Sequence, residues 1–189
     1  LPDPYNPPQR HWAKLHDGKP WGASAGIEFG PHGQLWAIDR CGANSCDGSN
    51  LPAVYRLDPR TATLTDLAKL PVGAGEAYGI CLYRERGTLY ALNVLKDGTI
   101  HQLAIDLKGP APTGKVVRTM KLATQSEGCV ADERTHRLYV AEEDVGLWRF
   151  DARPSGSTTP VKIADADGQH IVADTEGVTL AAEGPTNGG

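Results

Sequence analysis

Carboxylates recur at matching places along this sequence and could share one binding site. Glu127 and Glu176 each stand immediately before a glycine that opens an apolar run, while Glu143 closely follows such a run. Asp174 stands two residues before Glu176. Several carboxylates at one small opening repel each other unless a cation intervenes, and oxygen ligands without His or Cys favour the hard, highly coordinated Ca²⁺. The pattern predicts a calcium site formed by Glu127, Glu143, Asp174 and Glu176.

Two basic residues occupy comparable places and could bind a phosphate group beside that metal. Arg40 and Lys96 each follow shortly after an apolar run, and Tyr78 stands before a repeated glycine as Glu127 does. Bound calcium would reverse the local charge and attract a phosphate that bare carboxylates repel. A guanidinium holds phosphate as a planar fork, and an ammonium holds it as a point charge. The alternatives are solvated acids at loop ends and, for Tyr78, a packing role.

The elements that would bring these side chains together are strands in a repeat. Four related runs are opened by Gly26, Gly79, Gly128 and Gly177, which lie 53, 49 and 49 residues apart. Each period continues with a second apolar run, a run of alternating apolar and polar residues, and an outer run. A period near fifty made of short strands is typical of a β-propeller, in which one period is one four-stranded antiparallel blade. The functional site is then expected where the innermost strands meet at the central channel.

The repeat predicts an all-β chain with about three blades, at 23–70, 76–122 and 125–165, and the first strand of a fourth at 174–189. Residues 1–22 contain five prolines, which predicts an extended lead-in before the propeller domain at 23–189. This lead-in could supply a stray outer strand. Because propellers close with roughly four to eight blades, we expect the chain to be a fragment of a longer ring.

The composition narrows the expected partners. A net charge of −4 disfavours a nucleic-acid-binding surface, which is usually basic. No stretch is long and apolar enough to predict a membrane-spanning helix, so no membrane partner is expected. We expect a small-molecule ligand and a full-length protein that is a monomer.

The four cysteines fall into two pairs with different expectations. Cys41 and Cys46 lie in a loop rich in Gly, Asn and Ser, where they either form a local disulfide or remain thiols. Cys81 stands two residues after its repeat glycine and Cys129 only one, so their side chains should point to opposite strand faces. We therefore expect these two to remain unpaired as buried thiols.

Six runs of the chain form an ordered set, at 77–83, 96–98, 125–132, 141–148, 165–170 and 173–180. In order and spacing they resemble the β-propeller phytases. The resemblance implies a secreted or periplasmic, calcium-dependent, 3-phytase-like phosphomonoesterase that releases phosphate from phytate on a six-bladed propeller. It also implies that Tyr78 and Lys96 contact the substrate, that Arg40 binds phosphate, and that the four carboxylates named above hold the calcium.

For the reaction, the resemblance and the residues together indicate direct attack by a metal-activated water, with Tyr78, Glu127 and Glu143 as the catalytic residues. No Ser, Cys or His constellation offers a protein nucleophile. Since earlier ligands and later blades have no match here, we expect the 189-residue chain alone to be weakly active or inactive.

The first part of the chain suggests a different class of protein. Residues 10–50 are more similar to secreted NHL-type propellers, whose blades serve binding or other chemistries. The alternative function is therefore a non-catalytic, NHL-like binding module, whose acidic mouth holds structural calcium or water. Calcium-dependent release of phosphate from phytate separates the two hypotheses.

Overall fold

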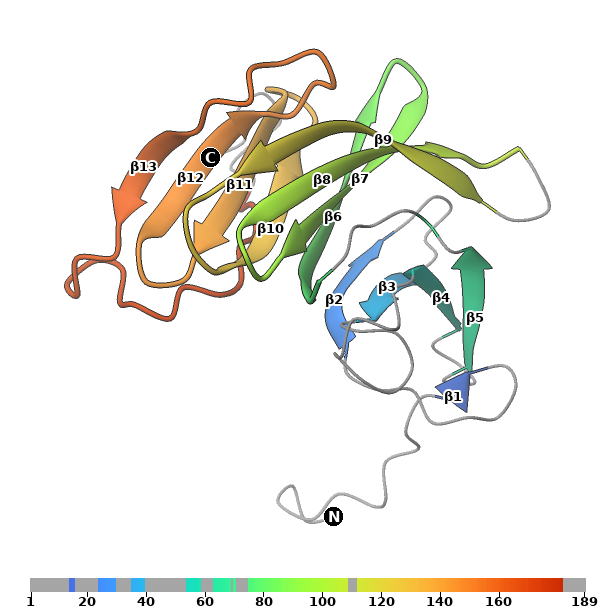
Figure 1. Ribbon diagram of the computed structural model, residues 1–189, viewed down its shortest axis with the longest axis horizontal. Helices are drawn as coiled ribbons and strands as arrows, with labels where there is room; N and C mark the ends of the chain where they lie inside the picture. Colours follow the sequence, from blue (N-terminus) through green and yellow to red (C-terminus); the bar gives the residue numbers. More distant parts are fainter. Residues whose placement is uncertain are drawn as a thin grey trace, which may run out of the picture.

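The computed structural model describes residues 14–15, 24–29, 35–39, 54–58, 63–68, 70, 75–108 and 112–181. Every regular element in these residues is a β-strand, and the strands form three separate sheets (Figure 1). Apart from one short edge strand, neighbouring strands in each sheet are antiparallel. The prediction of an all-β chain of four-stranded blades is confirmed.

The first sheet is the blade nearest the N-terminus. Its strands are β1 (Lys14–Leu15), β2 (Ser24–Phe29), β3 (Leu35–Asp39), β4 (Val54–Asp58) and β5 (Thr63–Ala68). Strands β2 to β5 follow chain order across the blade, and β1 pairs in parallel with β5 at the outer edge. The lead-in therefore contributes a fifth strand to this blade.

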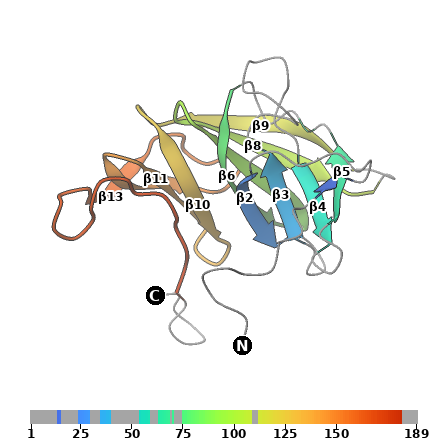
Figure 2. The ribbon, with the colours of Figure 1, turned by 90° about the horizontal axis from the view of Figure 1, so that it is seen from below.

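The second and third sheets repeat the plan without an added strand. The second blade contains β6 (Ala77–Glu85), β7 (Thr88–Leu95), β8 (Thr99–Asp106) and β9 (Thr113–Lys121). The third contains β10 (Ser126–Asp132), β11 (Arg137–Glu142), β12 (Gly146–Asp151) and β13 (Val161–Asp165). Figure 2 shows that the first strands of the three repeats, β2, β6 and β10, lie next to one another.

The predicted first strand of a fourth blade is not formed in residues 175–181. This segment contacts the third blade through a hydrogen bond of 2.8 Å, which the Gly128 amide donates to the Glu176 carbonyl. A strand requires a hydrogen-bonded partner along its length. The described part of the chain offers no second strand with which this segment could build a blade.

The second blade lies between the other two, so both of its faces are buried. One face packs against the first blade, where Trp36 and Leu89 belong to one apolar cluster. The other face packs against the third blade, where Leu92 meets Leu138 and Val140 in a second cluster. Successive side chains of a strand point to opposite faces, so a sheet covered on both faces needs the nearly continuous apolar run seen in β7.

The expectation that Cys81 and Cys129 remain unpaired is wrong. They form a disulfide, with their Cα atoms 5.8 Å apart. The sequence argument placed the two side chains on opposite faces of equivalent strands and treated this as a barrier to pairing. In two adjacent blades that pack face to face, one blade's forward face meets the next blade's rear face, so opposite orientations bring the sulfur atoms together. Cys41 and Cys46 lie outside the described residues.

Polar contacts also connect the second and third blades. The Tyr83 hydroxyl and His136 Nδ1 are hydrogen-bonded at 2.7 Å, and burial, followed by the nearby Glu85 and Asp151 carboxylates, raises the pKa of Tyr83 to about 12. Arg118 is 8% exposed and donates through Nη2 to the Asp151 carbonyl at 2.6 Å. These bonds satisfy buried polar groups that would otherwise be costly between two packed sheets.

Candidate functional site

The repeated glycines allow neighbouring blades to touch backbone to backbone. A Cβ atom at Gly79 would lie 2.2 Å from the Glu127 carbonyl oxygen, and one at Gly128 would lie 2.4 Å from the Glu176 carbonyl oxygen. Any larger residue would force the inner strands apart. The Glu127 carbonyl is thus held against Gly79 of the second blade, and the Glu176 carbonyl against Gly128 of the third.

A β-bulge lies at the same place in each blade. The strand register shifts between Ser24 and Gly26, between Ala77 and Gly79, and between Ser126 and Cys129. A bulge leaves a residue out of the regular pairing and changes the direction of its side chain. Tyr78 and Glu127 therefore stand at irregular positions, which simple strand alternation does not describe. The sequence analysis predicted no bulge, although a glycine inside an apolar run is a common position for one.

In the second and third blades, the turn after the second strand lies beside the bulge. In the second blade, the Lys96 amide donates to the Glu76 carbonyl at 2.9 Å, and in the third, the Glu143 amide donates to the Gln125 carbonyl at 3.0 Å. Lys96 and Glu143 are therefore structurally equivalent, each placed by the same hydrogen bond. The repeat gives one blade a cation and the next blade an anion at this position.

Arg40 lies outside the described residues. The residue before it, Asp39, pairs with Ser24 as Leu95 pairs with Ala77. In sequence, Arg40 thus follows a strand end that is equivalent to the one before Lys96. This equivalence supports the choice of Arg40 without placing its side chain.

Tyr78 and Lys96, both predicted to contact the substrate, lie next to each other in the second blade. The Lys96 ammonium lies 5.3 Å from the centre of the Tyr78 ring, in a cation–π contact. It also lies 3.8 Å from Glu76 Oε2. With 45% of its side chain exposed, Lys96 can still reach a ligand from solvent. Sequence reasoning missed Glu76, whose carboxylate faces the ammonium from the chain just before β6.

Glu143, Asp174 and Glu176 share one acidic neighbourhood. The Asp174 and Thr175 amides donate to the Glu143 carbonyl at 3.0 and 2.9 Å, which holds this loop against the turn. Partial burial raises the pKa of Glu143, and the charges of Asp144, Asp174 and Glu176 raise it further, with a side-chain hydrogen bond to Asp174. Asp174 has a φ of 74°, a left-handed conformation that is uncommon for residues other than glycine. Such strain is often kept where a side chain has a particular task.

Glu127 stands between these two groups along the row of inner strands. Its Oε1 accepts a hydrogen bond of 2.9 Å from Nε2 of the Gln125 side chain. Its backbone carbonyl faces Gly79, one residue after Tyr78, while the next residue, Gly128, faces Glu176. The backbone of Glu127 therefore contacts the second blade, and the next residue, Gly128, contacts the segment that contains Glu176.

The neighbouring Glu142 serves the blade instead of the mouth. It is 1% exposed. Its Oε1 accepts hydrogen bonds from the Thr124 amide at 2.7 Å and the Thr124 hydroxyl at 2.8 Å, and its Oε2 accepts one from Trp148 Nε1 at 2.6 Å. These bonds engage both oxygens of the buried carboxylate inside the third blade. Glu142 thereby anchors the turn that presents Glu143.

The acidic group has the donor chemistry for calcium, but its side chains are not gathered into a coordination shell. Among the described residues, no three His, Cys, Asp or Glu side chains lie close enough to hold a metal ion as they stand. The donors at the mouth are carboxylate oxygens, which suit hard cations. Burial is the largest cause of the raised pKa of Glu143, and the charges of Asp144, Asp174 and Glu176 add to it; a divalent cation would offset these charges. The residues therefore fit calcium by chemistry.

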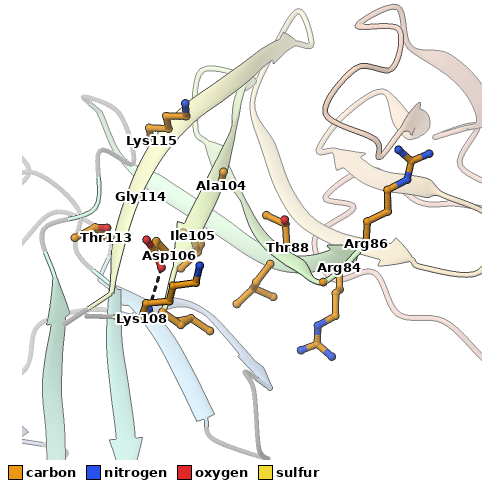
Figure 3. Close-up of a pocket in the computed structure, with 13 residues that line it drawn as sticks. Arg84, Arg86, Thr88, Ala104, Ile105, Asp106, Lys108, Thr113, Gly114 and Lys115 are labelled. Atoms are coloured by element: carbon orange, nitrogen blue, oxygen red, sulfur yellow. Dashed lines mark hydrogen bonds between the residues drawn. The ribbon is translucent and has the colours of Figure 1, made fainter. Parts of the chain in front are cut away.

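A large cavity of about 980 Å³ lies elsewhere, at the far end of the second blade (Figure 3). Its basic lining residues are Arg84, Arg86, Lys108 and Lys115. Figure 3 shows that Arg84 and Arg86 extend in different directions, so the cations do not converge on one point. Since β6 begins near Tyr78 and ends at Glu85, this cavity is separate from the carboxylate site.

In the part of the chain described, no helix could cross a membrane.

Comparison with known proteins agrees with the sequence resemblance. The model of the Phytase family matches residues 26–188. A 3-phytase of Bacillus subtilis (strain 168) is 37% identical over 145 residues, which cover 73% of this chain and 38% of that enzyme. The chain thus spans about two fifths of the length of this curated relative. The crystal structure of Sqt1 from Chaetomium thermophilum, at 11% identity, has a TM-score of 0.53 over 76% of this chain and 37% of its own, and shows a shared fold alone.

Proposed function

The chain belongs to the phytase family, and on that premise we propose that it forms part of a calcium-dependent phosphomonoesterase that releases phosphate from phytate. One observation carries the proposal. Lys96 contacts the Tyr78 ring in the second blade, and the inner strand of the adjoining third blade carries Glu127, while Glu143 has acidic neighbours. A polyanionic substrate needs both the cation and a way to offset the acids.

On the substrate side, Lys96 supplies positive charge for phosphate oxygens, and the Tyr78 hydroxyl can donate a hydrogen bond to substrate or water. The hydrogen bond from the Lys96 backbone amide to the Glu76 carbonyl fixes the start of the lysine side chain. The Glu76 carboxylate keeps the ammonium near the mouth before substrate arrives. Arg40 is proposed as a second phosphate-binding residue, from its place after Asp39.

On the acidic side, Glu127, Glu143, Asp174 and Glu176 would hold the calcium. When bound there, calcium supplies positive charge that offsets the charge of the phosphoryl oxygens and lowers the pKa of a coordinated water. The carboxylates would keep this charge at the site, and the hydrogen bonds from the Asp174 and Thr175 amides to the Glu143 carbonyl hold Asp174 beside Glu143. In this proposal Glu127 and Glu143 would accept a proton from the attacking water, and Tyr78 would orient it.

We also propose that the protein is secreted or periplasmic and acts on a small molecule as a monomer. The Cys81–Cys129 disulfide supports the compartment, because disulfides persist mainly in oxidising surroundings. The net charge of −4 supports a small-molecule substrate over a nucleic acid.

The test is phosphate release from phytate by the full-length protein, measured with calcium and with an excess of a calcium chelator. We expect release with calcium and loss of most of it with the chelator. Calcium binding without any phosphate release from phytate or a simple phosphomonoester would reject the proposal and favour the non-catalytic binding module.

A further inference from the structure

The disulfide joins the two strands that carry the two halves of the proposed site. Cys81 lies three residues after Tyr78 on β6, and Cys129 lies two residues after Glu127 on β10. The bond connects positions 48 residues apart in sequence. Along the two strands, the bond follows closely after the bulges at Tyr78 and Glu127.

Strands β6 and β10 belong to different sheets, so no shared ladder sets their relative height. β6 is hydrogen-bonded to β7, and β10 to β11. Where the two inner strands touch at the mouth, Gly79 meets the Glu127 carbonyl. A glycine permits this close approach but has no side chain to interlock with its neighbour. Packed elements of this kind can slide by small amounts, and a covalent bond limits such sliding.

The surroundings of the disulfide are apolar and would remain packed without the bond. Cys81 is 0% exposed and Cys129 is 8% exposed. Both belong to the cluster that includes Leu92, Val94 and Val140. Free thiols behave as small apolar groups, so the loss of the covalent bond can be separated from loss of the core.

We propose that the Cys81–Cys129 disulfide is a positioning link, which holds Tyr78 and Lys96 at a fixed offset from Glu127. The proposal rests on the proposed function, since it concerns the alignment of the phosphate-binding and carboxylate-bearing parts of one site. Neither cysteine touches the substrate. Cutting the link lets the two strands shift, and calcium and phosphate then bind to a poorly aligned mouth.

The test compares the full-length protein with Cys81→Ala/Cys129→Ala and with the unmutated protein reduced to its dithiol. The dithiol keeps every side chain and guards against misfolding of the double variant. Met120→Ala is the matched control, because Met120 is 2% exposed in the same cluster but lies on the outer strand β9. It weakens the core and leaves the link intact.

The first measurement is amide hydrogen exchange, which does not depend on activity. Cutting the link should speed exchange at residues 77–80 and 126–129 at least tenfold relative to β7 and β11. Met120→Ala should leave this ratio within about threefold of that in the unmutated protein. The second measurement is the calcium concentration for half-maximal phosphate release, which should rise at least fivefold without the link and stay within twofold in Met120→Ala.

Unchanged exchange at both inner-strand segments in the double variant and in the dithiol would overturn the proposal, and so would an unchanged calcium requirement. The disulfide would then contribute to stability alone. If the disulfide-bonded protein releases no phosphate with calcium, the proposed function fails. The exchange ratio still decides, in that case, whether the bond aligns the strands.

Discussion

At the scale of single residues, Lys96 is the clearest substrate-binding candidate. Its ammonium combines exposure with fixed neighbours, the Tyr78 ring and the Glu76 carboxylate. A charge-assisted hydrogen bond contributes about 1.5–3 kcal/mol. Replacing Lys96 by methionine keeps most of the length of the side chain and its apolar stem but removes the charge.

We therefore expect Lys96→Met to lower kcat/KM for phytate by about one to two decades. Calcium-induced stabilisation should persist, because Lys96 is not among the proposed metal ligands. Steady-state phosphate release and a thermal melt with calcium check both parts. Lys115→Met, which removes an exposed lysine at the far cavity, is the control and should change kcat/KM less than twofold. Equal losses in the two variants would show that net charge, and not position, matters.

The repeat glycine gives a second prediction at this scale. Gly79→Ala would place a Cβ 2.2 Å from the Glu127 carbonyl oxygen, which is backbone and cannot rotate away. Overpacking of this kind costs about 1–3 kcal/mol. We expect that loss in a denaturant titration, together with a higher calcium requirement, since Glu127 is displaced. Thr158→Ala, an exposed loop substitution, should stay within about 0.5 kcal/mol.

At the scale of elements, the sequence was informative about strands and less so about what happens between sheets. The 53, 49 and 49 spacing and the alternating runs predicted three sheets of four consecutive strands, and the first sheet gains β1 as a fifth. The glycine and the residue before it marked each inner strand. The bulge was not predicted, because a register shift depends on pairing across two strands and not on one run alone.

The candidate site was predictable to a similar degree. Tyr78 and Lys96, and Glu143 and Asp174, could be grouped because each stands at a similar distance from a repeated apolar run. Glu76 was missed, although it stands three residues before its repeat glycine, as Asp174 stands before Gly177. The Cys81–Cys129 pairing was misjudged because strand parity is a property of one sheet, whereas the bond crosses two.

The turn between β10 and β11 gives a pH prediction. Asp132 is 7% exposed and accepts bonds from the Thr135 hydroxyl, the Arg134 amide and Arg134 Nε. Burial alone would raise its pKa, but these bonds outweigh burial and hold the pKa below the ordinary value of 3.8. A depressed pKa stabilises the fold above the unfolded-state pKa, and this contribution is lost as the pH falls through the folded-state pKa.

We expect the stability of the unmutated protein to fall below about pH 4. Asp132→Asn should be less stable at neutral pH by about 1–3 kcal/mol, since it weakens charge-assisted bonds, but its stability should depend less on pH below 4. Denaturant titrations between pH 3 and 7 measure the difference. Asp106→Asn, which removes an exposed carboxylate, should retain the acid sensitivity of the unmutated protein. A parallel pH profile for Asp132→Asn would contradict the prediction.

At the scale of the whole molecule, acidic side chains gather beside the third blade. The charges of Asp144, Asp174 and Glu176 act on Glu143, and the Gly128 amide at the start of the third blade is hydrogen-bonded to the Glu176 carbonyl. A divalent cation at the mouth therefore reduces repulsion both within the site and between adjoining blades.

Because calcium would reduce this repulsion, we expect calcium to raise the stability of the full-length protein as well as its activity. A ligand that binds the folded state at one hundred times its Kd stabilises it by about 2.7 kcal/mol. Glu127→Gln/Glu176→Gln keeps the side-chain volumes but removes one carboxylate from each of two adjoining segments. Most of the calcium-dependent rise in Tm should therefore disappear.

Thermal melts with calcium and with chelator measure that rise, and the control needs the same change in net charge. Asp106→Asn/Glu133→Gln removes two exposed carboxylates away from the proposed ligands and should retain the full calcium response. The Gln double variant should also melt higher than the unmutated protein in chelator, because removing two carboxylates relieves the repulsion that calcium otherwise offsets. An unchanged calcium response in Glu127→Gln/Glu176→Gln would mean that calcium binds elsewhere, and the crowded carboxylates at the mouth would then need another cause.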